Sequence, residues 1–202
     1  MSDRFSVLFV CRGNTKRSRG AEVIAAAKAE RMGMDLDVSS AGLVAPTEGY
    51  ELFNSQRLQK VLKRRGYEAG YHRRQQVTRE MMEGKDLVLA MNNSHIKGIY
   101  DIAPDLMDKD TPIVDTLPAF VGYPHRRIVD PEERIDEVWK SEKWKWMRWM
   151  PYAFRRWYYR QYSGGAVDRR DEKAVMDLYD GIVRDIEGYV GLLLEKVRRD
   201  FL

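Results

Sequence analysis

Residues 6–42 carry the pattern that most limits the fold: a short apolar run, an amphipathic helix and a second short strand. Residues 6–10 read SVLFV, which is typical of a strand buried on both faces of a parallel sheet. Residues 18–32 have apolar side chains at helical spacing and are followed by Gly33, a residue that commonly terminates helices. The sequence LDVSSAG at 36–42 predicts the second strand, so the segment predicts a βαβ unit.

The remainder of the chain continues this alternation of strands and helices. The pattern predicts a helix at 52–65, a strand at 86–91, a helix at 92–100, a short strand within 111–117 and a final helix at about 172–199. Such alternation predicts an α/β protein with a parallel sheet covered on both faces and a ligand site at the carboxyl ends of the strands. Cys11 lies at such an end, and the length of 202 residues fits a single domain over 1–202.

Residues 139–170 do not follow the alternation and are interpreted as an aromatic and basic insertion within the domain, helical on both sides of Pro151. All five Trp lie there, with nine Lys or Arg against two acids, whereas the whole chain has a net charge of +4. Three hypotheses stay open for this segment. Its Trp rings pack on the protein's own helices, it contacts an anionic surface such as lipid headgroups or nucleic acid, or it binds a protein partner.

Cysteine and histidine usage restricts the chemistry. A single Cys excludes an internal disulfide and a multi-cysteine zinc site, and the three His have no paired metal-ligand spacing. We therefore expect neither a metal nor a cofactor. No charged-then-apolar leader opens the chain, and no apolar run approaches the roughly 20 residues that span a membrane. The expected location is the cytoplasm, where a free thiol stays reduced.

Residues 11–18, CRGNTKRS, connect the first strand to the first helix and resemble a phosphate-binding loop. Backbone N–H groups between a buried strand and a helix start can turn inward and, with the helix dipole, bind a dianionic phosphate. The same positive field favours a nucleophilic thiolate at Cys11. Arg17 is the expected bidentate ligand of two phosphoryl oxygens. The predicted phosphate-binding residues are Arg12, Gly13, Asn14, Thr15, Lys16 and Arg17.

Further residues have individual expected roles. Gly13 permits the tight turn, and Asn14 tolerates a left-handed conformation while its amide ties the loop together. Ser18 donates its hydroxyl to the sulfur, which favours the thiolate as a leaving group. Asp130, followed by Pro131, is the candidate acid that protonates the departing oxygen. The competing interpretations are an inert buried cysteine and a turn-forming Asp-Pro pair.

Five blocks of the sequence resemble the low-molecular-weight protein tyrosine phosphatases, in the order of that family and at nearly its spacing. They are VLFVCRGNTKRS (7–18), DVSSAG (37–42), HRRQQVTREMM (72–82), DLVLAMNNSH (86–95) and VDP (129–131). The resemblance implies a three-layer fold with a four-stranded parallel sheet flanked by helices. It also implies a two-step reaction: Cys11 forms a phosphocysteine while Asp130 protonates the leaving group, and Asp130 then activates water. Asn14, Ser40 and His72 match the family's residues that support the phosphate loop.

Several positions depart from the family's pattern. Lys16 stands where the family usually has a second Cys, so an oxidised Cys11 would need outside repair, and an arsenate reductase of this fold is disfavoured. Glu132 and Glu133 replace aromatic residues after the acid, and LVAPTEG lacks the aromatic residue expected after Ser-Ala-Gly. Thr15 matches the Thr of bacterial protein-arginine phosphatases, where tyrosine-directed members tend to have a bulkier aliphatic residue.

The sequence therefore predicts a cytoplasmic, metal-independent cysteine phosphatase that hydrolyses phosphomonoesters. Protein phosphotyrosine is the preferred substrate and protein phosphoarginine the alternative. The expected partner is a phosphorylated protein or a small phosphomonoester. A phosphate-binding module without catalytic activity is the alternative from another class, and the oligomeric state stays open.

Overall fold

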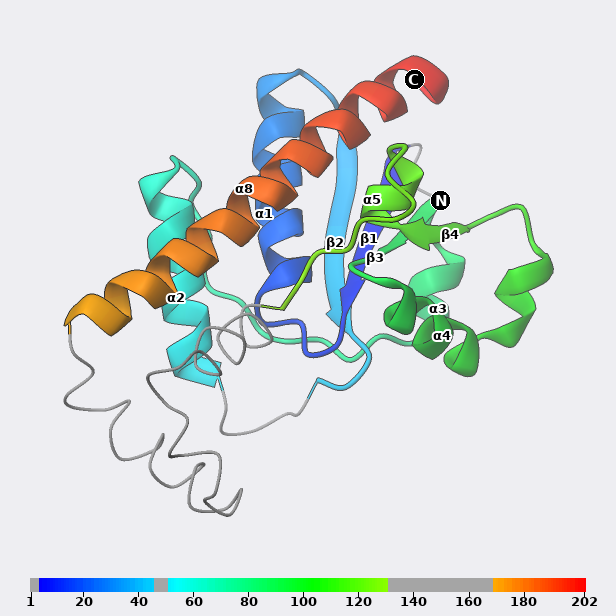
Figure 1. Cartoon of the computed structure of the whole chain (residues 1–202). Coiled ribbons are helices and arrows are strands. Elements are labelled where there is room, and N and C mark those ends of the chain that lie inside the picture. Colours follow the sequence, from blue (N-terminus) through cyan, green and yellow to red (C-terminus); the bar gives the residue numbers. More distant parts are fainter. Residues whose placement is uncertain (1–3, 46–50, 131–168) are drawn as a thin grey trace, which may run out of the picture.

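A computed structural model of the chain describes residues 4–45, 51–130 and 169–202. Its centre is a sheet of four parallel strands in the order β2-β1-β3-β4, as expected (Figure 1). The strands are β1 (Phe5–Cys11), β2 (Leu36–Gly42), β3 (Leu87–Ala90) and β4 (Ile113–Thr116). Because β1 lies between β2 and β3, the strand order reverses beside it. The carboxyl ends of β1 and β3 are therefore the usual position of a ligand site in such a sheet.

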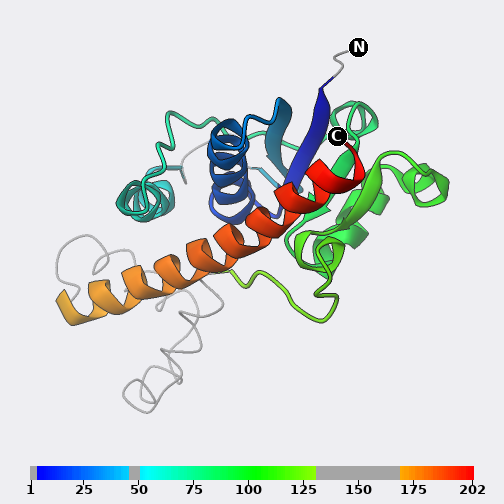
Figure 2. The same cartoon turned by 90° about the horizontal axis from the view of Figure 1, so that it is seen from above.

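Helices cover both faces of the sheet (Figures 1 and 2). They are α1 (Arg17–Arg31), α2 (Glu51–Arg64), α3 (Arg79–Glu83), α4 (Asn93–Ile102), the 3-10 helix η1 (Pro104–Asp108), α5 (Leu117–Phe120) and α8 (Arg169–Asp200). Side chains of α1, α2 and α8 form one core, and side chains of α3, α4 and η1 form the other. Helix α8 crosses α1 and α2 and contacts both (Figure 2). The three-layer prediction is confirmed.

The apolar run of β1 supplies both cores. Val7 and Phe9 pack with α1 and α8, whereas Leu8 and Val10 face the opposite core with α3 and α4. All four side chains are buried. A strand covered on both faces has no solvent-facing side to make polar, which explains the unbroken apolar pattern of this segment.

Three short helices, α3, η1 and α5, were not predicted from the sequence. Thr78 precedes α3 and its side chain accepts a hydrogen bond from the N–H of Met81. Thr116 precedes α5 and accepts in the same way from the N–H of Ala119. Helices of four or five residues are too short to show apolar periodicity, so the capping Thr is the main local signal of α3 and α5, whereas η1 has no side-chain cap and begins at Pro104.

Most of the predicted insertion at 139–170 lies outside the described residues. Its last two residues, 169 and 170, are the first residues of α8. The helical expectation for this segment and the three hypotheses for its surface therefore stay predictions. Within the described ranges, no helix is both long and apolar enough to cross a membrane. The cytoplasmic location also stays a prediction.

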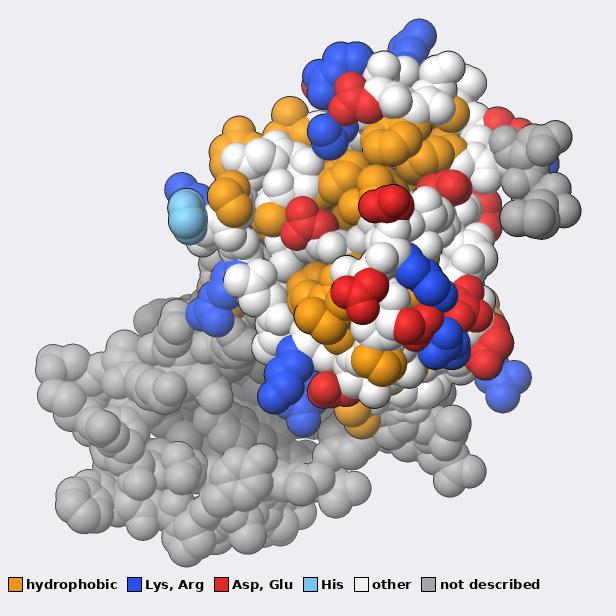
Figure 3. Space-filling view, turned by 90° about the vertical axis from the view of Figure 1, so that its right-hand side faces the viewer, with side chains coloured by type: hydrophobic (Ala, Val, Ile, Leu, Met, Phe, Trp, Pro, Cys, Tyr) orange, Lys and Arg blue, Asp and Glu red, His pale blue; other side chains and the backbone are white. Residues whose placement is uncertain are grey.

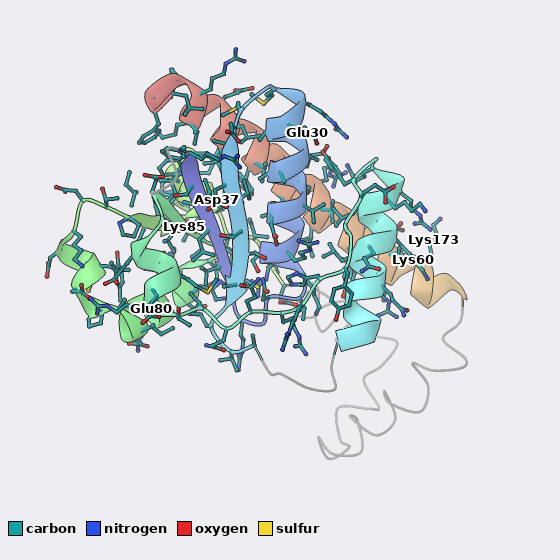
Figure 4. All side chains as sticks on the ribbon, turned by 180° about the vertical axis from the view of Figure 1, so that it is seen from behind. Glu30, Asp37, Lys60, Glu80, Lys85 and Lys173 are labelled. Carbon is teal, nitrogen blue, oxygen red and sulfur yellow. The ribbon has the colours of Figure 1, made fainter. Side chains whose placement is uncertain are left out.

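Charged side chains on the outside of the sheet layers are often paired. Lys85, just before β3, forms an ion pair with Asp37 on β2, and Figure 4 shows the two on neighbouring segments. Arg79 on α3 forms ion pairs with Glu83 and with Asp105 of η1, both at 2.7 Å. Figure 3 shows the side of the molecule that lies to the right in Figure 1, where acidic and basic side chains are interspersed. The face therefore lacks a broad field of one sign.

Candidate active site

The loop from Cys11 to Arg17 connects the end of β1 to α1 and provides no side-chain cap for that helix. Among the described non-glycine residues, Asn14 is the one with a positive φ, 51°. This left-handed conformation was predicted, and Asn tolerates it better than most residues. Gly13 has no positive φ, and a Cβ there would meet Thr15 Oγ1 at 3.7 Å and Val44 O at 3.9 Å, which are ordinary contacts. Neither a positive φ nor a close contact therefore demands glycine at position 13, and the prediction that Gly13 permits the turn stays a prediction.

Glycine is required instead at the end of β2. A Cβ on Gly42 would lie 2.8 Å from the backbone N of Asn14, 2.9 Å from the backbone C of Gly13 and 3.0 Å from the backbone O of Arg12. No side-chain rotation can relieve contacts with backbone atoms. Gly42 thus lets the phosphate loop lie directly against β2. Gly42 is the last residue of LDVSSAG, the segment predicted as the second strand. A glycine at the end of a strand is a known sign of close backbone approach.

The sulfur of Cys11 is buried and faces two potential donors. Ser18 Oγ lies 3.1 Å from Sγ, and the backbone N–H of Asn14 donates to Sγ at 3.3 Å. Ser18 Oγ also accepts from Asn14 Nδ2 at 3.1 Å, which leaves its own hydrogen for the sulfur or for Ala41 O at 3.4 Å. The expected contact between Ser18 and Cys11 is present, and both donors can stabilise a thiolate.

The amide of Asn14 holds the loop from several sides. Its Nδ2 donates to Ser40 Oγ at 2.8 Å, and its Oδ1 accepts from the backbone N–H of Gln75 at 3.0 Å. Ser40 Oγ in turn donates to Glu22 Oε2 at 2.6 Å. Asn14 is fully buried, so each of these bonds replaces one to water and restrains the loop. The structure brings Asn14 and Ser40 together as expected and adds Glu22 and Gln75, which the sequence analysis did not single out.

His72 contacts the same loop through its ring. Its Nε2 lies 2.8 Å from the backbone O of Asn14, so this nitrogen carries a proton and donates. Burial lowers the pKa of His72, and the charge of Arg19 lowers it further, although the bond to Asn14 opposes both. A lowered pKa favours the neutral ring, in which Nε2 remains the donor. His72 thus supports the loop without adding charge, consistent with its predicted supporting role.

Arg17, the first residue of α1, connects the loop to the segment that carries the candidate acid. Its Nη1 donates to Ile128 O at 3.1 Å and its Nη2 donates to Asp130 Oδ2 at 2.8 Å. Lys16 Nζ lies 3.6 Å from the other carboxylate oxygen, Oδ1. The two cationic side chains are buried, whereas Asp130 is partly exposed. The fold therefore places the candidate acid directly beside the phosphate loop.

His95 is a buried titratable residue near this site that the sequence analysis assigned no role. It lies in the first turn of α4, where its backbone N–H donates to Asn92 Oδ1 at 3.1 Å. Burial lowers the pKa of His95 to about 4, with a further lowering by Arg17 that Asp130 opposes. Its Nδ1 is buried and has no hydrogen-bond partner among the described residues. A neutral imidazole therefore lies within electrostatic range of both Arg17 and Asp130.

Other predicted residues have different positions. The side chain of Arg12 is exposed and that of Thr15 is partly exposed. Neither contributes a side-chain contact to the network around Asn14 described above, so their predicted phosphate contacts rest on backbone N–H groups. Glu132 and Glu133 lie outside the described residues, and any part they have in a substrate pocket stays a prediction.

The chain is similar to known proteins in both sequence and fold. Residues 6–141 match the family described as low molecular weight phosphotyrosine protein phosphatase. A protein-arginine-phosphatase of Bacillus subtilis (strain 168) is 32% identical over 137 residues, which is 68% of this chain and 86% of that protein. A protein-arginine-phosphatase of Geobacillus stearothermophilus is 36% identical over 140 residues, with 69% and 86% covered. A low molecular weight protein tyrosine phosphatase from T. tengcongensis has a crystal structure that superposes with a TM-score of 0.66 at 28% identity, covering 95% of this chain and 99% of that one.

The fold and the family match define a phosphatase, a hydrolase of the cysteine-dependent class. The chain belongs to the low molecular weight phosphotyrosine protein phosphatase family. The predicted family and enzyme class are thereby confirmed.

Proposed function

We propose that this phosphatase removes phosphoryl groups from arginine side chains of proteins, with Cys11 as the nucleophile. Two curated relatives that are 32% and 36% identical are both protein-arginine-phosphatases, which supports this substrate. Thr15 supports it too, because it matches the residue that arginine-directed members carry in the phosphate loop. The phosphotyrosine prediction stays open as a second candidate.

The side chain of Arg17 is the observation that carries the phosphoryl-binding part of the proposal, whereas the choice of phosphoarginine rests on the two relatives and on Thr15. Arg17 is 4% exposed, and its buried Nε has no hydrogen-bond partner among the described residues. A buried guanidinium N–H without an acceptor is costly, so an anionic oxygen is the natural partner for it. Cys11, the last residue of β1, is at the other end of the loop from Arg17, and its sulfur accepts from the N–H of Asn14. A phosphoryl group bound between these points meets a nucleophile and a cation.

The first chemical step transfers the phosphoryl group to sulfur. Cys11 Sγ attacks phosphorus, an S–P bond forms, and the P–N bond to the guanidine group breaks. Asp130 gives its proton to the departing nitrogen, so the arginine side chain leaves without a negative charge. For a phosphotyrosine substrate, the P–O bond breaks and the proton goes to the phenolate oxygen.

The second step regenerates the enzyme. Water attacks the phosphocysteine, Asp130 as a carboxylate takes a proton from that water, and the S–P bond breaks. Inorganic phosphate and the Cys11 thiolate result. The hydroxyl of Ser18 and the N–H of Asn14 can both donate to the departing sulfur, which makes it a better leaving group.

Phosphotyrosine remains the second candidate because of one surface residue. Tyr71 is 92% exposed and directly precedes His72, whose ring donates to the phosphate loop. An exposed aromatic side chain next to a loop-supporting residue offers a surface on which a phenyl ring could pack. Position 71 differs from the two places where the family's aromatic residues are missing from this chain, after Asp130 and after Ser-Ala-Gly.

Peptides carrying phosphoarginine, phosphotyrosine and phosphoserine, compared with one enzyme preparation, test the proposal. We expect the highest kcat/KM for phosphoarginine. Thr15→Ile should reduce the preference for phosphoarginine over phosphotyrosine by roughly 10-fold or more, because a larger aliphatic side chain reshapes the loop rim, whereas Thr15→Ser should retain it. A higher kcat/KM for phosphotyrosine in the unmodified enzyme would favour the second candidate. Failure to turn over any of the three would favour a silent binding module.

A further inference from the structure

Lys16 is a buried lysine in the phosphate loop, at the position where the family usually has a second cysteine. The residue is 5% exposed, whereas lysine is usually a surface residue. Burying an ammonium group costs free energy unless an opposite charge or hydrogen bonds compensate. The compensating group here includes the carboxylate of Asp130, whose Oδ1 lies 3.6 Å from Lys16 Nζ. The lysine side chain is therefore directed to the candidate acid.

The carboxylate of Asp130 is shared between two cations, one on each oxygen. Arg17 Nη2 lies 2.8 Å from Oδ2, and Lys16 Nζ lies 3.6 Å from Oδ1. The side chain of Asp130 is 22% exposed, while those of Lys16 and Arg17 are 6% and 5% exposed. Charges in such a partly dry site interact more strongly than on an open surface.

The two cationic side chains have different roles in the proposed reaction. Arg17 is the residue proposed to bind phosphoryl oxygens. When a phosphoryl group is bound, the positive charge of Arg17 is therefore shared between that group and Asp130. The ammonium group of Lys16 lies 3.6 Å from the carboxylate of Asp130, and the proposed phosphoryl contacts of Arg17 do not require it to leave that position. His95 of α4 is a further titratable group that interacts electrostatically with Asp130. Burial lowers the pKa of His95 to about 4. Its ring is therefore neutral near pH 7 and does not replace the charge of Lys16.

We propose that Lys16 is a positioning residue for the acid: its ammonium group holds the carboxylate of Asp130 over the phosphate loop and favours the ionised carboxylate. This inference rests on the proposed function, in which Asp130 protonates the leaving group. A positive charge within about 4–6 Å makes a carboxyl group give up its proton at lower pH. The pH range over which Asp130 can act as an acid is therefore set in part by Lys16.

The pH dependence of kcat/KM on phenyl phosphate tests this role, because a poor leaving group depends on the acid. In Lys16→Met, the alkaline limb of the profile should move to higher pH by roughly one unit, since the protonated carboxyl is no longer opposed by the ammonium. Lys16→Arg should restore the limb toward its original position. Lys97→Met, a change of an exposed lysine on α4, is the matched control and should leave the limb in place.

A second measurement separates positioning from direct phosphate binding. Competitive inhibition by inorganic phosphate should change by less than about threefold in Lys16→Met. An inhibition constant that rises by tenfold or more while the alkaline limb stays in place would overturn the inference and make Lys16 a phosphate ligand. Lys16→Gln gives a second neutral variant in case Lys16→Met folds poorly. Circular dichroism checks the folding of both variants. Lys16→Gln should shift the alkaline limb in the same direction as Lys16→Met.

Asp130→Asn distinguishes failure of this inference from failure of the proposed acid. If Asp130→Asn removes the alkaline limb and the Lys16 variants do not move it, Asp130 stands as the acid and Lys16 has no positioning role. If Asp130→Asn leaves both rate and limb unchanged, the assignment of the acid is itself wrong.

Discussion

The guanidinium of Arg17 donates to the carboxylate of Asp130 across 2.8 Å, although 113 positions separate the two residues in the chain. The backbone O of Ile128 accepts from the same guanidinium at 3.1 Å. The segment carrying the proposed acid is thus bound to the proposed phosphate ligand by two hydrogen bonds. A phosphoryl group that binds to Arg17 would arrive next to an acid already in position.

Asp130→Asn should lower kcat on a substrate with a poor leaving group by roughly 10²–10⁴-fold, because a carboxamide cannot supply the proton. The effect on p-nitrophenyl phosphate should be smaller, since p-nitrophenolate leaves without a proton. Steady-state kinetics on phenyl and p-nitrophenyl phosphate measure both. Asp101→Asn, on the exposed side of α4, is the control and should retain the rate. Equal rates for Asp130→Asn and the unmodified enzyme would assign the acid to another residue.

Cys11→Ser should abolish turnover of p-nitrophenyl phosphate, because a serine hydroxyl beside the same donors is a far weaker nucleophile than a thiolate. The unmodified enzyme should keep its activity in EDTA if the reaction needs no metal. Since the chain has one Cys, mass spectrometry after iodoacetamide treatment should find one modified residue and a parallel loss of activity. Residual turnover in reduced Cys11→Ser at the original rate would contradict the proposed nucleophile.

Gly42→Ala should destabilise the protein by roughly 1–3 kcal/mol, since its Cβ would lie 2.8–3.0 Å from backbone atoms of the phosphate loop. Gly13→Ala is the matched control, because a Cβ there meets neighbours at 3.7 Å and 3.9 Å. Urea denaturation of both variants gives the free energies of unfolding. We expect the loss for Gly42→Ala to exceed that for Gly13→Ala by at least about 1 kcal/mol; the reverse order would show that the loop can shift away from β2.

His95 should make stability depend on pH in the acidic range. Burial holds its pKa at about 4 in the folded protein, below the ordinary value of 6.5. The unfolded chain therefore binds more protons between these values. The stability contribution of the neutral ring is fully present above pH 6.5 and is lost as the pH falls through about 4. The loss amounts to about 3 kcal/mol.

Denaturation curves from pH 7 to pH 4 measure this dependence. His95→Gln, which cannot titrate, should show a smaller fall in the free energy of unfolding over that range than the unmodified protein. His125→Gln changes an exposed histidine and should leave the fall unchanged. Parallel curves for His95→Gln and the unmodified protein would mean that His95 is protonated at the same pH in both states.

Much of the fold was predictable because its signals are local. The buried strand at 6–10, the helix that ends before Gly33 and the strand at 86–91 each follow from runs or periods of apolar residues, and the structure has β1, α1 and β3 there. The short helices α3, η1 and α5 span too few residues to produce a period. The family resemblance supplied the number of strands, which composition and spacing alone did not.

The residues of the candidate site also fall into two groups, those predictable from the local sequence and those that were not. The placement of Cys11, Asn14 and Arg17 could be predicted because they lie within one short loop between a strand and a helix. Glu22 and His95 received no role, since nothing in their local sequence marks a charged partner or a buried ring. Gly42, at the end of a predicted strand, carried a local sign of close backbone approach, but the sequence did not show which segment approaches it.

The sequence by itself determined which groups are available for the proposed chemistry: a strand that ends in the single thiol of Cys11, a loop of five residues, and Arg17 at the start of a helix. Only the tertiary structure decided how that chemistry is supported and controlled. The parallel register places Gly42 against the loop, and the segment after β4 returns to bring Asp130 to Lys16 and Arg17. Contacts between residues distant in the chain depend on which strand ends meet at one sheet edge. That is a property of the packed sheet and not of any local segment.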